Sequence, residues 1–138
     1  MRLVLLPDHD WCKEGKIDWN EAVAENFILY NRTSYTFRLV HNYLDGKGIK
    51  LNSFMEISSP EATKELIKVG MGVGIMAGWA VEEERKHGEL QSLSLGLPKL
   101  TRTWGISVRK GRKLNKAERI FIKIGEESGC HWMVNKER

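Results

Sequence analysis

Residues 57–88 read ISSPEATKELIKVGMGVGIMAGWAVEEERKHG, and this stretch predicts the fold class. A strand end is followed by Ser59, a good helix N-cap, and by Pro60, which suits the first helical position because its missing N–H would have no partner there. Gly70 stands where a helix commonly ends in a left-handed residue. The apolar run 73–77 is typical of a parallel strand buried on both faces. Strand, helix, strand and helix at this spacing predict an α/β fold.

The helix predicted within this stretch carries apolar residues at helical spacing. Ala62, Leu66 and Val69 fall on one face with Ile67 beside them, and we expect this face to be buried. Residues 8–18 are polar and predict irregular structure. The other expected strands cover residues 2–6, 26–30, 51–57, 89–95 and 102–110, and the other expected helices cover residues 19–24, 35–45, 82–88 and 116–124.

Length and composition favour one compact domain, or one lobe with part of another. The chain has 138 residues, of which 41% are hydrophobic. No run approaches the roughly 18–20 apolar residues of a membrane-spanning helix, and no signal peptide is recognisable. Cys12 and Cys130 lie far apart in the sequence, and neither has a partner at metal-ligand spacing. We therefore expect reduced thiols and a cytoplasmic location.

Charge is distributed unevenly along the chain. Residues 1–100 hold 12 basic and 14 acidic side chains, whereas residues 101–138 hold 10 basic and 4 acidic ones, a net charge of +6. The dense part comprises Arg109, Lys110, Arg112 and Lys113. A basic run can indicate nucleic-acid binding, but no set of aromatic residues alternates with this one. We interpret it as a solvated turn between a strand and a helix.

Several segments, in this order, resemble one known family. They are LVLLPDHD (3–10), SSPEATKELIKVGMGVGI (58–75), WAVEEE (79–84), GEL (88–90) and LTRTWGISVRKGRKLN (100–115). Together they are similar to the effector-binding domain of LysR-type transcriptional regulators, and the resemblance extends over residues 1–124. It implies a periplasmic-binding-protein-like (type II) α/β lobe with a mostly parallel sheet, plus the return strand and terminal helix of the partner lobe. Residues 1–100 would form the second lobe, residues 101–128 the return strand and helix of the first lobe, and residues 129–138 a tail.

The same resemblance implies a function. Members of the family have an N-terminal winged helix-turn-helix, a linker helix and a two-lobed domain whose cleft binds a small-molecule effector. This sequence matches only the portion from the first crossing between the lobes onward, so it looks like a truncated fragment. The implied function is the effector-sensing part of a transcription regulator, which would contact DNA only through the missing N-terminal domain. The alternative is a stand-alone solute-binding protein of the same fold, with which the lack of an export signal agrees poorly.

Strand order predicts where a small molecule would bind. The predicted strands 26–30, 51–57 and 72–77 are joined by helices, so we expect one parallel sheet, and the family places the first strand between the other two. Ligands of such sheets bind at the carboxyl ends of the strands, where the strand order reverses. The segments 31–34 and 58–59 also begin helices, whose free N–H groups and positive ends suit a small anion.

The candidate effector-binding residues are therefore those that follow these three strands: Thr33, Ser34, Ser58, Ser59, Met76 and Ala77. By resemblance, Ser58 falls where a serine or threonine of the family often contacts the effector. Serine and threonine at helix starts are also ordinary caps, and both interpretations remain open for each hydroxyl.

Nothing in the sequence forms a catalytic, metal or cofactor motif. The chemically reactive candidates are His9, His41, His87, His131, Cys12 and Cys130, and no spacing pairs them into a nucleophile–base or ligand set. The glycines of the segment 70–74 precede their strand, whereas a phosphate-binding loop follows one. We expect no enzyme activity, no metal and no cofactor.

The family also implies a dimer. Its effector domains pair antiparallel through a surface that resembles the helix 35–45 and the strand 51–57. That strand alternates between apolar and polar residues and is expected at a sheet edge, which readily accepts another chain. Leu39, Tyr43 and Phe54 are the predicted interface residues. The alternative is that they pack within their own lobe.

Overall fold

The structure is a computed structural model that describes residues 1–102, 105–106, 108–109 and 111–127. It divides into two units, Met1–Thr101 and Arg102–Arg138, and each is described here by itself. The predicted tail, residues 129–138, lies outside the described residues. Among the described residues, no helix is long and apolar enough to cross a membrane.

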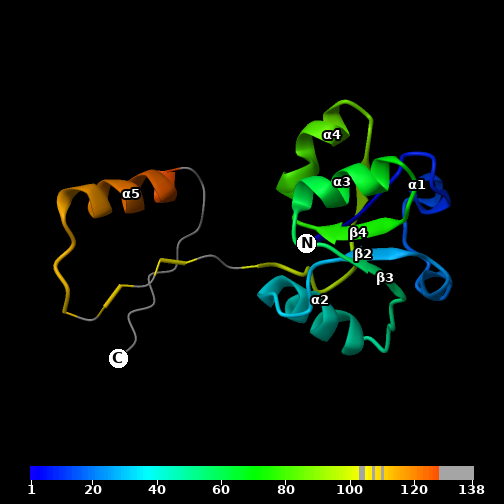
Figure 1. The fold of residues 1–138 in the computed structure, drawn as a ribbon, viewed down its shortest axis with the longest axis horizontal. Helices are drawn as coiled ribbons and strands as arrows, with labels where there is room; N and C mark the ends of the chain where they lie inside the picture. The colour runs from blue at the N-terminus through cyan, green and yellow to red at the C-terminus, as the bar shows by residue number, and fades with distance from the viewer. Residues whose placement is uncertain (103–104, 107, 110, 128–138) are drawn as a thin grey trace. The chain divides into compact units, whose positions relative to one another are not determined.

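The first unit is built on one five-stranded sheet (Figure 1). Its strands are β1 (Arg2–Leu5), β2 (Phe27–Leu29), β3 (Ser53–Glu56), β4 (Val73–Met76) and β5 (Gln91–Leu93). They lie in the order β3-β2-β4-β1-β5. As predicted, β2 runs parallel to β3 and β4 and lies between them. β1 pairs antiparallel with both β4 and β5, so the sheet is mixed and mostly parallel.

Two layers of helices cover this sheet. The helical elements of this unit are α1 (Asp10–Glu14), η1 (Glu21–Val23), α2 (Tyr35–Asp45), α3 (Pro60–Lys68), η2 (Gly78–Val81) and α4 (Glu82–Lys86), whereas α5 (Lys116–Glu127) belongs to the second unit. Figure 1 shows α3 and α4 on one side of the sheet and α2 on the other. The α/β class predicted from the sequence is therefore confirmed, although the predicted helix 19–24 is only the short 3-10 turn η1.

The core has two parts, one on each face of the sheet. Neighbouring residues of β1 alternate between them, because successive side chains of a strand point to opposite faces. Leu3 packs with Phe27 and with Val40 of α2, whereas Val4 packs with Ile28 and with Ile67 of α3. All of these side chains are buried. This arrangement fixes both helices with their first turns at the same end of the sheet.

The buried face of α3 agrees with the prediction only in part. Ile67 is buried and Leu66 packs against the core as predicted, and Thr63 is buried as well, whereas Ala62 is exposed and Val69 is 70% exposed. The reason is a close approach between the helix and β4. A Cβ added to Gly74 would lie 2.9 Å from Ile67 Cδ1, so the missing side chain at this position makes room for Ile67. The sequence pattern around Ala62 carried no sign of that contact.

A second correction concerns α1, where the sequence predicted irregular structure. His9 caps this helix, because its Nδ1 accepts a hydrogen bond from the Trp11 backbone N–H at 3.2 Å. The helix is held in place by the Trp11 side chain, which is only 2% exposed and belongs to the core. A histidine cap is not among the usual N-cap residues, which explains why the pattern was missed.

The second unit contains α5 and the residues that precede it. A capping box begins α5, and its sequence signal is Asn115 followed three residues later by Glu118: Asn115 Oδ1 accepts from the Glu118 N–H at 2.9 Å, and Glu118 Oε2 accepts from the Asn115 N–H at 2.8 Å. The apolar side chains Ile120 and Phe121 are exposed. No strand is present at residues 102, 105–106 or 108–109 of the predicted return strand, because none of these has a ladder partner in the described part of the chain. The other residues of that predicted strand, 103–104, 107 and 110, lie outside the described residues.

Candidate functional site

The carboxyl ends of β2, β3 and β4 form one edge of the sheet. Since these strands are parallel neighbours, the segments 30–34, 57–59 and 77–79 that follow them lie at the same edge. Five of the six candidate residues belong to these segments. The sixth, Met76, is the last residue of β4, and its side chain is 1% exposed within the core. Met76 packs in the core beneath the edge, and its contact with an effector stays a prediction.

The turn after β2 uses both of its hydroxyl groups. Asn31 Oδ1 accepts from the Thr33 N–H at 2.9 Å and from the Thr33 hydroxyl at 2.7 Å, which closes a side-chain turn. Ser34 Oγ accepts from the Phe37 N–H at 3.0 Å and caps α2. Of the two caps that the sequence allowed for this helix, the structure therefore selects Ser34. Thr33 is exposed, and its hydroxyl oxygen keeps its acceptor capacity.

The two adjacent serines in the turn after β3 differ in their hydrogen bonding. Ser59 Oγ accepts from the Ala62 N–H at 3.2 Å, as an N-cap of α3, and donates to Glu61 Oε2 at 3.3 Å. Ser58 is exposed, and its side chain has no hydrogen bond within the described part of the chain. Ser58 thus presents a hydroxyl that can still both donate and accept, while Ser59 is used within the fold.

Sequence reasoning did not select Arg32, which also lies in the turn after β2. Its Nε donates to Glu56 Oε1 and its backbone N–H donates to Glu56 Oε2 at 3.3 Å. The guanidinium beside Glu56 lowers the pKa of that carboxyl. A basic residue after β2 and an acidic one at the end of β3 were visible signals, but only the pairing of the two strands shows that the charges meet.

Arg2 is a second residue that sequence reasoning did not select. It begins β1, and because β1 is antiparallel to β4 it lies opposite Met76, at the same edge of the sheet as the three turns. Figure 1 shows the N-terminus at the end of the sheet from which α2 and α3 start. Its Nε donates to Ser92 Oγ and its Nη2 donates to the Ser92 carbonyl, both at 2.9 Å.

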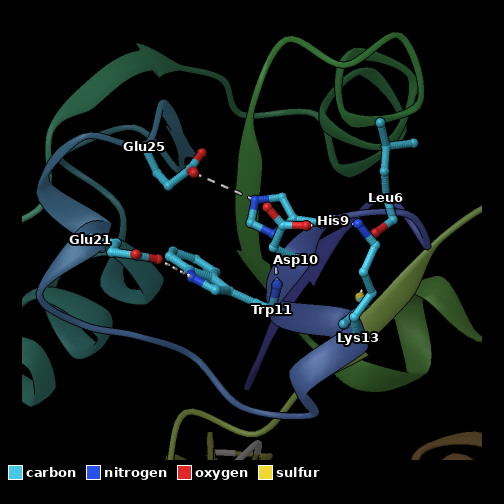
Figure 2. A network of polar contacts seen from close by, with 8 residues as sticks. Leu6, His9, Asp10, Trp11, Lys13, Glu21 and Glu25 are labelled. Carbon is cyan, nitrogen blue, oxygen red and sulfur yellow. Dashed lines mark hydrogen bonds and ion pairs between the residues drawn. The ribbon is translucent and has the colours of Figure 1, made fainter.

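His9 and Cys12, which were considered as metal ligands, have structural partners instead (Figure 2). His9 Nε2 lies 3.5 Å from Glu25 Oε1, and Trp11 Nε1 donates to Glu21 Oε2 at 3.3 Å, so α1 is tied to the segment 21–25. Cys12 Sγ donates to the Leu6 carbonyl at 3.4 Å, and burial raises the pKa of this thiol. Among the described residues, no group of three or more His, Cys, Asp or Glu side chains is placed to hold a metal ion.

The predicted dimer residues Leu39 and Tyr43 are half-buried and pack against the core. The Tyr43 hydroxyl donates to the Leu95 carbonyl at 3.1 Å, and Lys47 Nζ lies 4.6 Å from the centre of the tyrosine ring. β3 lies at an edge of the sheet, as expected. The side chain of Phe54 is outside the description, and pairing through this surface stays a prediction.

The family was identified by comparison with known proteins. The family model described as the LysR substrate binding domain matches residues 1–128. The chain belongs to the LysR substrate-binding domain family. The transcriptional activator CmpR of Synechocystis is a relative, 31% identical over 115 residues, which cover 83% of this chain and 38% of CmpR. The RuBisCO operon transcriptional regulator of Allochromatium vinosum is 25% identical over 116 residues, with the same coverage of 83% and 38%.

These LysR relatives are transcriptional regulators, not enzymes, and this chain spans about 38% of their length. Solved structures of the family share the fold. The effector-binding domain of QuiR in complex with shikimate has a TM-score of 0.70 at 18% identity, covering 96% of this chain and 62% of that one. The regulatory domain of Synechocystis CcmR in complex with 2-PG has a TM-score of 0.73 at 20% identity, covering 96% and 63%.

Proposed function

We propose that this chain is the effector-sensing part of a LysR-type transcriptional regulator and that it binds a small anionic molecule at the carboxyl-end edge of β2, β3 and β4. The proposal depends on a difference in hydrogen bonding between two adjacent serines. Ser59 is used as the cap of α3, whereas the exposed hydroxyl of Ser58 has no partner in the described part of the chain. That leaves Ser58 available to a ligand at the edge where ligands of such sheets bind.

The edge also has the electrostatics that an anion requires. The helices α2 and α3, of 11 and 9 residues, both start there, and their aligned peptide dipoles place partial positive charge at the edge. Thr33 and Ser58 add exposed hydroxyl oxygens beside these helix ends. Two structural neighbours were solved with small molecules, shikimate and 2-PG, which supports the same class of ligand for this chain.

The proposal includes a mechanism of signalling and a cellular setting. A ligand held between the edge and the rest of a complete effector domain would favour one arrangement of the two lobes and so shift their equilibrium. DNA would be contacted by a separate helix-turn-helix domain, since CmpR is named an HTH-type transcriptional activator and the match covers only 38% of it. A DNA-binding regulator of this kind would act in the cytoplasm.

The experiment compares Ser58→Ala with Ser59→Ala by NMR titration with shikimate and with 2-PG. We expect weak binding, because this chain matches only 62% and 63% of the two neighbours that were solved with these ligands. NMR titration is suitable because it detects weak binding. Ser58→Ala should weaken binding by about 1.5–3 kcal/mol, the usual contribution of a hydrogen bond to a charged group. Ser59→Ala should instead lower the free energy of unfolding by about 0.5–2 kcal/mol, as for other lost N-caps, and should affect the dissociation constant less.

Two results would contradict the proposal. One is that neither compound, nor inorganic phosphate, shifts the resonances of residues 31–34 and 57–59. The other is that binding is detected but Ser58→Ala leaves the dissociation constant unchanged. Urea unfolding of both variants provides the control that each is folded.

A further inference from the structure

We infer that Glu56 is an internal competitor of the effector: its carboxylate occupies Arg32, the cation that the negatively charged group of the effector takes over on binding. The inference rests on the proposed function and adds a means by which the edge limits its own affinity. Arg32 lies in the turn after β2, beside Thr33, and Glu56 is the last residue of β3, two positions before Ser58. The pair therefore joins the two turns that contain the proposed ligand hydroxyls.

The Glu56 carboxylate is bound as the carboxylate of a ligand would be. One of its oxygens accepts from the backbone N–H of Arg32 at 3.3 Å, and the other accepts from Nε of the same residue. A backbone N–H and a guanidinium N–H are the donors that proteins commonly offer to a carboxylate or a phosphate. This edge of the sheet thus holds a carboxylate, although that carboxylate belongs to the chain itself.

Strand pairing brings the two residues together. β2 and β3 are parallel neighbours, Leu29 is paired with Glu56, and the Ile57 N–H donates to the Leu29 carbonyl at 2.8 Å (Figure 1). Glu56 is therefore fixed at the end of the ladder, next to the turn that contains Arg32. Arginine has five N–H donors, and those on Nη1 and Nη2 of Arg32 have no acceptor in the described part of the chain. These donors are available to a second oxyanion.

The pair is charged, and it is weak enough to exchange partners. The hydrogen bond from Arg32 lowers the pKa of Glu56, so the carboxylate is ionised at neutral pH. The side chain of Arg32 is 71% exposed and that of Glu56 is 30% exposed. Because water screens it, an exposed ion pair is favoured over its separated partners by a factor of about five at most. A carboxylate or phosphate of the effector can therefore replace Glu56 on the guanidinium.

A pair that only ties the two turns together would have the same contacts, but it would respond differently to a neutral side chain. Glu56→Gln keeps a carbonyl oxygen that can accept from Arg32, whereas the competing negative charge is gone. A structural tie would be preserved or weakened by this change, and neither result would improve the binding of an anion. Competition predicts a gain of affinity.

The test is an NMR titration of the 138-residue chain with shikimate, with 2-PG and with inorganic phosphate. Glu56→Gln should bind the anion about three- to five-fold more tightly than the wild type, because Arg32 is no longer occupied. Arg32→Gln should bind it about three-fold or more weakly. When Glu56→Gln is added to Arg32→Gln, it should change the affinity by less than about two-fold, because no cation remains to compete for.

The matched control is Glu61→Gln. Glu61 is an exposed acidic residue in the first turn of α3, at the same edge, and its carboxylate accepts from Ser59 Oγ at 3.3 Å rather than from Arg32. Its replacement removes the same charge without freeing the guanidinium. The affinity should therefore change by less than about two-fold, as expected for a screened surface charge.

A second measurement needs no substitution. In the titration of the wild type, the Nε–H resonance of Arg32 and the carboxyl carbon of Glu56 should shift with the same dissociation constant as the amides of residues 31–34 and 57–59. Binding that leaves both side-chain signals in place would overturn the inference. Urea unfolding shows whether each variant is folded, and the wild-type signals decide the matter if one of them is not.

The remaining outcomes separate this inference from the proposed function. If Glu56→Gln binds no more tightly than the wild type while Ser58→Ala is weakened, the inference is wrong and the proposed function stands. If Glu56→Gln tightens binding equally with and without Arg32, or no more than Glu61→Gln does, the effect is one of charge repulsion and the inference is overturned. If no anion shifts the edge residues of the wild type, both fail.

Discussion

A substitution at position 74 tests how closely α3 packs against β4. Gly74 is a buried residue of β4, and a Cβ at this position would approach Ile67 Cδ1 to 2.9 Å and Thr63 Cγ2 to 3.4 Å. The first distance is shorter than ordinary carbon–carbon contact, so the added methyl group must displace Ile67. Gly74→Ala should therefore push α3 away from the sheet, and Ile67→Val should relieve the clash because it removes Cδ1.

The expected changes in the free energy of unfolding follow from the close packing between position 74 and Ile67. Overpacking a core by a methyl group costs about 1–3 kcal/mol, and the smaller entropy of an unfolded chain with alanine returns about 0.4–1 kcal/mol. Ile67→Val alone should cost about 0.5–1.5 kcal/mol. In the double variant the new methyl group occupies the space that Cδ1 has left. We therefore expect the double variant to be at least about 1 kcal/mol more stable than the sum of the single effects.

Equilibrium urea unfolding of the wild type, the two single variants and the double variant measures this coupling, provided that the m-values agree. The control cycle combines Gly74→Ala with Val40→Ala, a buried residue of α2 on the opposite face of the sheet, and its effects should add to within about 0.5 kcal/mol. If the effects of Gly74→Ala and Ile67→Val add equally well, contact with Ile67 is not the reason for glycine at position 74, and the reasoning is refuted.

Three other expectations concern pH, association and DNA. Lys64 Nζ lies 2.7 Å from Glu84 Oε1, and this hydrogen bond lowers the pKa of Glu84 below its ordinary value of 4.5. The ion pair therefore stabilises the fold above pH 4.5, and this stabilisation is lost as the pH falls through the lowered pKa. The stability difference between wild type and Glu84→Gln should thus shrink from pH ~7 to pH ~3 in urea unfolding; a constant difference contradicts this. If the chain dimerises through α2 and β3, light scattering should show a dimer for the wild type and a monomer for Phe54→Glu with Tyr43→Glu; identical masses would count against that surface. Finally, anisotropy titrations should detect only weak, salt-sensitive DNA binding by this chain, and nanomolar, sequence-dependent binding at physiological salt would disprove it.

Local signals in the sequence predicted most of the secondary structure. Ser59 and Pro60 begin α3, Ser34 begins α2, and Asn115 and Glu118 close the capping box of α5. A cap depends on groups within about four residues of one another, so it can be recognised without knowledge of the fold. The same holds for the buried run of β4, whose apolar residues are adjacent in the sequence.

Features that depend on distant partners were predicted less well. Of the predicted apolar face of α3, Leu66 packs against the core, but Ala62 and Val69 are exposed, and the residues that approach Gly74 of β4 are Ile67 and Thr63. The antiparallel direction of β1 was not predicted either. It depends on pairing with β4, about 70 residues later in the chain, and the pattern of β1 itself is equally compatible with both directions.

The sequence alone determined that hydroxyl residues follow two neighbouring parallel strands and begin helices, and its resemblance determined the family that the match over residues 1–128 confirmed. Only the tertiary structure decided that Arg2 and Arg32 lie at the same edge and which residues they contact. The physical reason is the range of the interactions. Caps and periodic burial are settled by residues close in sequence, whereas the partners of Arg2 and Arg32 are decided by strands that meet only when the sheet has formed.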